Sequence, residues 1–191
     1  MSDWKPWVEY PHLWKTKSAF YAWLRGCLRG GLWNKSPIKL SFKNSAVSAP
    51  PAGYSGRAKS GAECALSGVW TSKSFLEVDH KLGNVSLNDE SDIIRFIKHL
   101  VPAKDSMQLV SKEAHKIKSY AERYNMSYDD AVIVKNVIEI MKKHSIKYQL
   151  NMLTNAGYDI KLVKNAKQRR QLLTKMLKEN QNAKEDKEAV N

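Results

Sequence analysis

The sequence predicts an α+β fold in which short strands lie between helical flanks. Two segments, 64–80 and 107–110, carry β-branched and aromatic residues bounded by turn residues, a pattern typical of strands. Before and after them, apolar residues recur at helical spacing. The chain has 191 residues, which corresponds to one domain, or to one small domain with appendages.

Composition divides the chain into four regions. A basic arm, helix and loop occupy 1–60, a strand-rich core occupies 61–124, and a helical region occupies 125–179. Residues 180–191 are polar and are expected to be disordered.

The charge balance points to a polyanionic partner. Lysine and arginine number 32 against 19 aspartates and glutamates, which gives a net charge of +13. The excess lies in residues 1–60 (net +8) and 121–191 (net +5), whereas the middle of the chain is neutral. This distribution favours nucleic acid as the partner. The alternative is a basic surface that only maintains solubility.

The same sequence excludes several classes of protein. No run approaches the roughly 18–20 apolar residues that a membrane span needs, and the first residues lack the layout of a secretory signal. Cys27 and Cys64 are the only cysteines, which excludes a disulfide framework and a zinc site of four thiolates. We therefore expect a cytoplasmic protein without a membrane partner.

The N-terminal region divides into an arm, a helix and a loop. Residues 1–15 hold three tryptophans and two prolines, which predicts an extended arm packed on the core. From Lys15 to about Trp33 the apolar residues fall at helical spacing, and Gly30-Gly31 is expected to fray or end this helix. The stretch 44–62, rich in Ser, Ala, Pro and Gly, predicts a long loop.

The centre predicts strands and the C-terminal half predicts helices. Residues 64–80 read as a β-hairpin whose turn is Thr71–Ser74, and 107–110 as a further short strand before a polar helix over 111–123. Other helices are expected to begin near residues that can cap them, namely Ser91-Asp92, Ser127, Ser145 and Asn165.

Two histidines in a defined context carry the chemical signal. Asp79-His80 ends the predicted hairpin, and His115, 35 residues beyond His80, opens the helix that follows the 107–110 strand. This order of strand, Asp-His, excursion, strand and histidine-bearing helix resembles the HNH endonucleases and their ββα-metal fold. The stretches 77–80 and 107–119 are similar to those of phage-encoded members. The resemblance covers about residues 60–124, with weaker similarity around 23–29 and 166–170.

The resemblance implies metal-dependent hydrolysis of DNA phosphodiester bonds. His80 would be the general base, because a neutral imidazole, with its usual pKa of about 6.5, can take a proton from water at physiological pH. Asp79 and His115 would hold one divalent cation, Mg²⁺ or Mn²⁺. Since adjacent strand residues point to opposite sides, Asp79 should face the helix and the ion, and His80 the water. Lys118 follows His115 by one helical turn and is expected to hold a phosphate.

Two features depart from the family pattern. Family members often hold a structural zinc on four cysteines, and three of these thiolates are absent here, so a structural zinc is not expected. The four corresponding places read Cys64, Ser67, Ser111 and Ala114. The family's middle asparagine, which orients the base, corresponds to Ser106, and Asn84 or Asn88 are alternatives for that role. The remaining histidines, His12, His99 and His144, have no motif context and are expected to be structural or exposed.

Affinity for DNA is expected to come from cations on the flanking helices. The candidate phosphate contacts are Arg25 and Arg29 on the first helix and Lys167, Arg169 and Arg170 on the last. A solvated helix face is the alternative for each. The two C-terminal helices are candidates for a helix-turn-helix-like reader, but the apolar stripe at 172–177 would serve dimerisation equally, which leaves the oligomeric state open.

The sequence therefore leads to one function with two rivals. The first is a phage-encoded HNH endonuclease that serves either homing or phage DNA processing. The second is a catalytically weak DNA-binding accessory protein on the same scaffold. The third, an RNA-binding protein, is disfavoured because no glycine-aromatic signature of RNA-binding modules is present.

Overall fold

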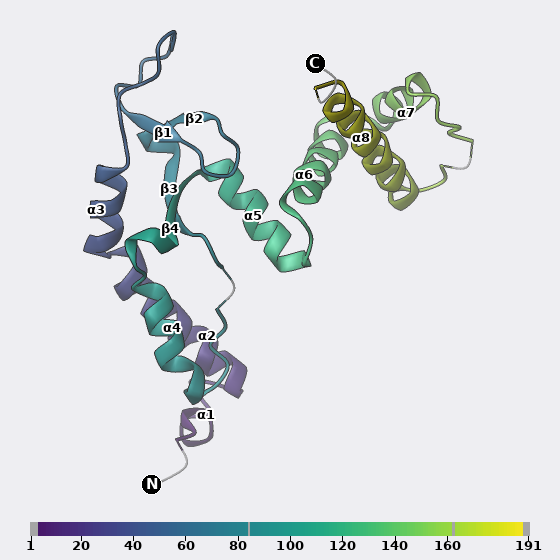
Figure 1. Cartoon of the computed structure of the whole chain (residues 1–191). Coiled ribbons are helices and arrows are strands. Elements are labelled where there is room, and N and C mark those ends of the chain that lie inside the picture. The colour runs from purple at the N-terminus through teal and green to yellow at the C-terminus, as the bar shows by residue number, and fades with distance from the viewer. Residues whose placement is uncertain (1–3, 84, 162, 189–191) are drawn as a thin grey trace. The chain divides into compact units, whose positions relative to one another are not determined.

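The computed structural model describes residues 4–83, 85–161 and 163–188. The predicted α+β class is confirmed, because helices are combined with two small antiparallel sheets (Figure 1). The chain divides into two compact units, Met1–His115 and Lys116–Asn191. The division falls inside helix α5 (Lys112–Tyr124), so the basic N-terminal region shares one unit with most of the predicted core.

The first unit begins with helices α1 (Pro6–Glu9) and α2 (Lys17–Leu28). The predicted extended arm instead contains a helical turn, because Pro6 occupies the first helical position, where its fixed φ favours a helix. The Thr16 side chain accepts a hydrogen bond from the amide of Ala19 (3.1 Å) and so caps α2.

The predicted end of the first helix at Gly30-Gly31 is wrong. The chain continues as a π-helix, η1 (Arg29–Asn34), and then forms helix α3 (Pro37–Ser45), which the sequence had not predicted as a helix. The wider π turn accommodates the two glycines and keeps Leu32 and Trp33 against the apolar core.

Aromatic rings form much of the first core. Buried residues of α2, α4 (Ile93–Leu100) and the segment before α4 pack together, and these are Phe20, Tyr21, Leu87, Phe96 and Leu100. Three tryptophan rings of the arm lie with their centroids 5.1–5.8 Å from the ring of Phe20, and these are Trp4, Trp7 and Trp14. The arm therefore packs on the core as predicted.

Strand pairing differs from the predicted 64–80 hairpin. Strand β1 (Gly61–Glu63) pairs with β2 (Trp70–Ser72), whereas β3 (Leu76–His80) pairs with β4 (Met107–Ser111), both antiparallel. A 3₁₀ turn, Lys73–Phe75, separates β2 from β3. The first pairing requires a glycine at position 61. A Cβ there would lie only 2.3 Å from the carbonyl oxygen of Thr71, so a larger residue would clash. The β3–β4 pairing buries four apolar side chains on one face, Leu76, Val78, Met107 and Leu109.

The second unit consists of the remainder of α5 with α6 (Tyr128–Lys143), α7 (Ile146–Asn155) and α8 (Ala166–Glu188). The predicted caps are confirmed, because the side chains of Ser127, Ser145 and Asn165 each accept a backbone N–H three residues later, at 3.0, 3.3 and 2.9 Å. Among the described residues, no helix combines the length and the apolarity that crossing a bilayer requires.

Two expectations for the C-terminal region change. Disorder from residue 180 is wrong as far as residue 188, because α8 continues to Glu188 through a run without glycine or proline; residues 189–191 lie outside the described part. The apolar stripe at 172–177 is used within the unit, since Leu173 and Met176 are buried against Val137 and Leu153. Its use in dimerisation is therefore not needed to explain the pattern.

Truncation of the second core should cost much more than the same change on the surface of the same helix. Leu153 is fully buried in α7, so Leu153→Ala is expected to lower the free energy of unfolding by about 2–5 kcal/mol. Ile146, also in α7, is 58% exposed, and Ile146→Ala should change it by no more than about 0.5 kcal/mol. Urea denaturation followed by circular dichroism measures both, and equal losses would contradict the packing of α7.

Candidate functional site

Strand β3 presents two carboxylates on the face that α5 approaches. Glu77 and Asp79 are alternate residues of the strand and therefore point to the same side. The imidazole of His115 lies against both: its Nδ1 is 2.7 Å from Oε2 of Glu77, and its Nε2 is 3.5 Å from Oδ1 of Asp79. The structure thus brings together Asp79 and His115, which the sequence separates by 36 positions.

Hydrogen bonds at the start of α5 determine the position of His115. The Ser111 hydroxyl accepts a hydrogen bond from the amide of Ala114 (3.0 Å), which caps the first turn of the helix. The amide of Ser111 in turn donates to the buried sulfur of Cys64 (3.2 Å), so the helix start is tied to the loop before β2. Burial raises the pKa of the Cys64 thiol, but hydrogen bonds from Ser67 and Ser111 outweigh that effect and leave the pKa below its usual value.

The strand opposite β3 orients Asp79. Gln108 lies directly across from Asp79 in the register, and its side-chain amide donates to Oδ2 of the carboxylate (3.1 Å). The other oxygen, Oδ1, points toward Nε2 of His115. Asp79 is only 8% exposed, so these two contacts define the orientation of a carboxylate that is largely shielded from solvent.

The donor atoms of Asp79 and His115 fit a divalent cation. An ionised carboxylate only accepts hydrogen bonds, so Nδ1 of His115 carries the proton that it shares with Glu77. In the neutral ring the lone pair of Nε2 then faces the negative Oδ1, an arrangement that a cation or a second proton must stabilise. A histidine whose other nitrogen donates to a carboxylate is typical of metal ligands. In the described part of the chain, no group of three or more His, Cys, Asp or Glu side chains is placed to hold a metal ion; Asp79 and His115 are a pair.

His80 lies on the opposite side of β3, as strand alternation predicted, but it does not face open water. Its ring packs against Trp33 (centroids 4.1 Å apart) and against His99 of α4 (4.0 Å, with planes 25° apart), and the residue is 8% exposed. The expectation of a solvent-facing His80 is wrong because the π-helix and α4 both bring rings to this end of the strand.

His99 is a residue that the sequence analysis had read as structural or exposed. The spacing of apolar residues already indicated that His99 is partly buried, because it shares a side of α4 with the buried Phe96 and Leu100. That pattern indicates burial, but the contact with His80 depends on how α4 packs on the end of β3, which periodicity does not reveal.

The two described candidates for orienting His80, Ser106 and Asn88, make contacts of other kinds. Ser106 is exposed, and its carbonyl accepts from the amide of Lys81 (3.0 Å), so its backbone extends the β3–β4 ladder. The amide of Asn88 donates to the Asp92 side chain (2.9 Å) near the start of α4. Asn84 lies outside the described residues.

Several cations expected to contact DNA also make contacts within the fold. The Arg25 guanidinium donates to the carbonyl of Leu87 (2.7 Å), and Arg29 lies 5.6 Å from the centre of the Phe96 ring. Both contacts tie α2 and its extension to the segment that contains α4, and they explain why arginines recur there without any reference to a ligand.

The second unit shows the same division of roles. Arg169 donates to the buried amide of Gln149 (2.7 Å), and Lys118 pairs with Glu122 (3.3 Å) with only 13% of its side chain exposed. Lys167 and Arg170 are exposed, as a phosphate contact requires.

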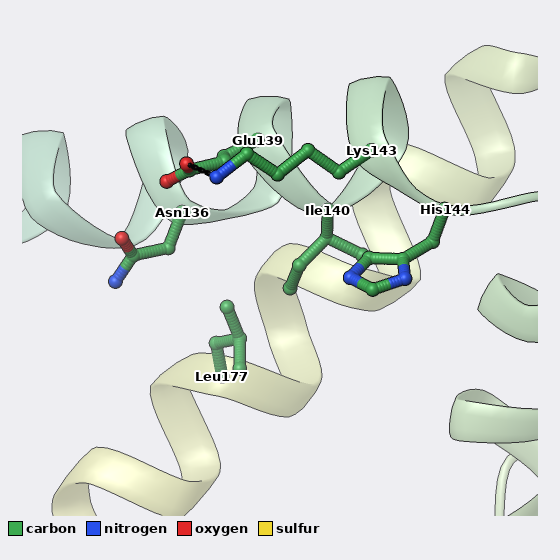
Figure 2. A pocket seen from close by; sticks show the side chains of 6 residues that line it. All are labelled: Asn136, Glu139, Ile140, Lys143, His144 and Leu177. Atoms are coloured by element: carbon green, nitrogen blue, oxygen red, sulfur yellow. Dashed lines mark ion pairs between the residues drawn. The ribbon is translucent and has the colours of Figure 1, made fainter.

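The second unit also carries a hollow of about 440 Å³ between α6 and α8 (Figure 2). Its two charged lining residues, Glu139 and Lys143, pair with each other across one helical turn of α6. The hollow is lined by Asn136, Glu139, Ile140, Lys143, His144 and Leu177. No carboxylate–histidine contact comparable to that of His115 is described there, so it does not compete as the chemical site.

No family model, curated protein or solved structure matches this chain. What bears on function is therefore the arrangement of β3, β4 and α5, with the Asp79–His115 contact at its centre.

The contact with Glu77 should set the tautomer of His115. In the intact protein at neutral pH, we expect ¹H–¹⁵N spectra of the histidine rings to show the His115 proton on Nδ1. Glu77→Ala should remove this preference, whereas Glu113→Ala, the same change on the exposed first turn of α5, should leave it. An unchanged His115 signal in Glu77→Ala would contradict the contact.

Proposed function

We propose that the chain is a metal-dependent endonuclease of the HNH type, which hydrolyses DNA phosphodiester bonds on a ββα-metal core made of β3, β4 and α5. The observation that carries this proposal is the approach of His115 Nε2 to Asp79 Oδ1, at 3.5 Å, from a helix that directly follows the second strand. The net charge of +13 agrees with a nucleic-acid substrate.

In this proposal Asp79 and His115 hold one divalent cation, Mg²⁺ or Mn²⁺, for which carboxylate oxygen and imidazole are suitable ligands. When bound, such an ion supplies positive charge beside the scissile phosphate and its departing oxygen. Gln108 positions the carboxylate of Asp79, and Glu77 positions the ring of His115. The two supporting residues come from the same sheet as the ligand, so one ladder sets the geometry of the whole group.

His80 acts as the general base that takes a proton from the attacking water. Trp33 and His99 pack against its ring, and its Nε2 is buried, so water must reach this nitrogen through a local opening of the site. The two rings therefore fix the plane of the base. This supports a replacement of the family's orienting asparagine, whose place is taken here by Ser106, with aromatic contacts.

A second feature supports the family assignment. The places that carry zinc cysteines in many members lie together in this structure, because Cys64 accepts hydrogen bonds from Ser67 and Ser111, and Ser111 caps Ala114. A hydrogen-bonded cluster thus joins the same two loops that a structural zinc would join. The core requires no second metal in this proposal.

The alternative function is a catalytically weak DNA-binding accessory protein on the same scaffold. One observation favours it: His80 is 8% exposed, which restricts the access of water to the base. For the endonuclease, homing and phage DNA processing both fit, in the cytoplasm of a host cell.

Removal of the general base should abolish most cleavage. With Mg²⁺ or Mn²⁺, the intact protein is expected to convert supercoiled plasmid to nicked or linear DNA, and His80→Ala should slow this by about 10²–10⁴-fold. His144→Ala is the matched control, because His144 stacks on Tyr148 in the other unit. Plasmid that stays supercoiled with every divalent metal would favour the accessory protein, and full activity in His80→Ala would refute the assigned base.

Loss of the buried carboxylate should weaken metal binding independently of cleavage. Calorimetric titration with Mn²⁺ is expected to show at least a tenfold weaker affinity for Asp79→Asn, since even changes behind the ligands typically cost about 10–100-fold. Asp105→Asn, the same change at an exposed position of the same unit, is the control. Equal affinities for the two variants would show that Asp79 is not a ligand.

A further inference from the structure

Four lysines surround the start of β3, next to the candidate site. Two come from the unpredicted helix α3, one from the turn before β3 and one from the first residue of α5, and we call them the lysine cluster: Lys39, Lys43, Lys73 and Lys112. None of them was a candidate from the sequence, because they lie up to 73 positions apart and only the packing of α3 and α5 on β3 brings them together.

The two lysines of α3 are held by neutral groups. Lys43 donates to the carbonyl of Leu76 at the first residue of β3 (2.6 Å). Lys39 lies 4.6 Å from the centre of the Trp33 ring, the same ring that packs against His80. Both ammonium groups are thus positioned by contacts with groups that carry no negative charge.

The other two lysines lie near an exposed aromatic ring, that of Phe75. Lys73 donates to the side-chain oxygen of Asn44 (2.8 Å), and Lys112 lies 5.9 Å from the centre of the Phe75 ring. Phe75 is 63% exposed, so its ring is accessible at the surface beside Lys112.

Burial and neighbouring positive charges lower the pKa values of the two lysines of α3. Burial lowers the pKa of Lys43 first, and the nearby charges of Lys73 and Lys112 lower it further. Burial also lowers the pKa of Lys39, against the opposing effect of Glu77. Within the described residues, no carboxylate lies within ion-pair distance of any of the four ammonium groups.

The position of the cluster relates it to the candidate site. Glu77, whose charge acts on both Lys39 and Lys43, is the residue that binds Nδ1 of His115. An anion that bridges the lysines would therefore lie near Glu77, at the start of β3. Fixed cations next to an exposed aromatic ring are typical of surfaces that follow a nucleic-acid strand, where phosphates contact the cations and a base or sugar contacts the ring.

We propose that the lysine cluster binds consecutive phosphates of the DNA strand that enters the candidate site, with Phe75 in contact with a base or sugar of that strand. The choice of DNA as the polyanion rests on the proposed function. The cluster, rather than the arginines of α2 that serve the fold, then provides the main phosphate contacts of the first unit.

The test measures DNA binding without any cleavage. Lys73→Gln/Lys112→Gln removes two charges whose contacts are with Asn44 and Phe75 at the surface, and Lys15→Gln/Lys17→Gln removes two from the exposed start of α2 in the same unit. Binding of a fluorescein-labelled DNA duplex of mixed sequence is followed by anisotropy in EDTA over a range of salt concentrations.

We expect the cluster variant to bind more weakly, with a slope of log K against log salt that is smaller by about two, because each phosphate contact contributes about 0.9. The control variant should keep the slope of the intact protein. Equal slopes for all three proteins, or equal losses in the two variants, would overturn the proposal. If the double variant loses the circular dichroism spectrum of the intact protein, Lys112→Glu at its exposed position replaces it, with an expected change in the same direction.

Plasmid cleavage separates this inference from the proposed function. Absence of metal-dependent cleavage, together with a reduced salt slope in the cluster variant, would refute the endonuclease and retain the binding site. Cleavage by the intact protein together with an unchanged slope in the cluster variant would refute the lysine cluster alone.

Discussion

The contact of His115 with Glu77 and Asp79 is the interaction on which the candidate site depends. It joins the first turn of α5 to the end of β3, so it requires the β3–β4 ladder and the capped helix start together. One imidazole lies between two carboxylates, so its second nitrogen faces a negative oxygen, and either a second proton on the ring or a cation stabilises that contact. Gln108 adds to it by fixing the other oxygen of Asp79.

The surroundings of His80 are formed by rings from distant segments. The carbonyl of Ser106 accepts a hydrogen bond from the amide of Lys81 and so extends the ladder beside His80. The ring of His80 packs against Trp33 of the π-helix and against His99 of α4. Rings restrict the plane of an imidazole without engaging its nitrogens, at the expense of exposure to solvent.

The basic residues divide into two groups with different physical roles. Arg25, Arg29 and Arg169 make internal contacts, where the planar guanidinium can satisfy carbonyl and amide oxygens or lie on a ring. The lysine cluster instead brings positive charges together at the edge of the candidate site. A count of cations predicts the class of partner, but only contacts distinguish the cations that stabilise the fold from those that remain available to a ligand.

The sequence by itself determined the α+β class, the positions of most helices and their caps, and the Asp79, His80 and His115 framework, because periodicity, capping side chains and strand alternation are local properties. It failed at the π turn, at α3 and at the partner of each strand, and it did not predict the contact between His99 and His80. Strand pairing and ring stacking depend on which apolar surfaces are buried together. Those surfaces come from segments that are distant in the sequence, so local patterns do not reveal which of them meet. The tertiary structure alone therefore decided that Glu77 also contacts His115, that His80 is covered by rings, and that four separate lysines share one surface.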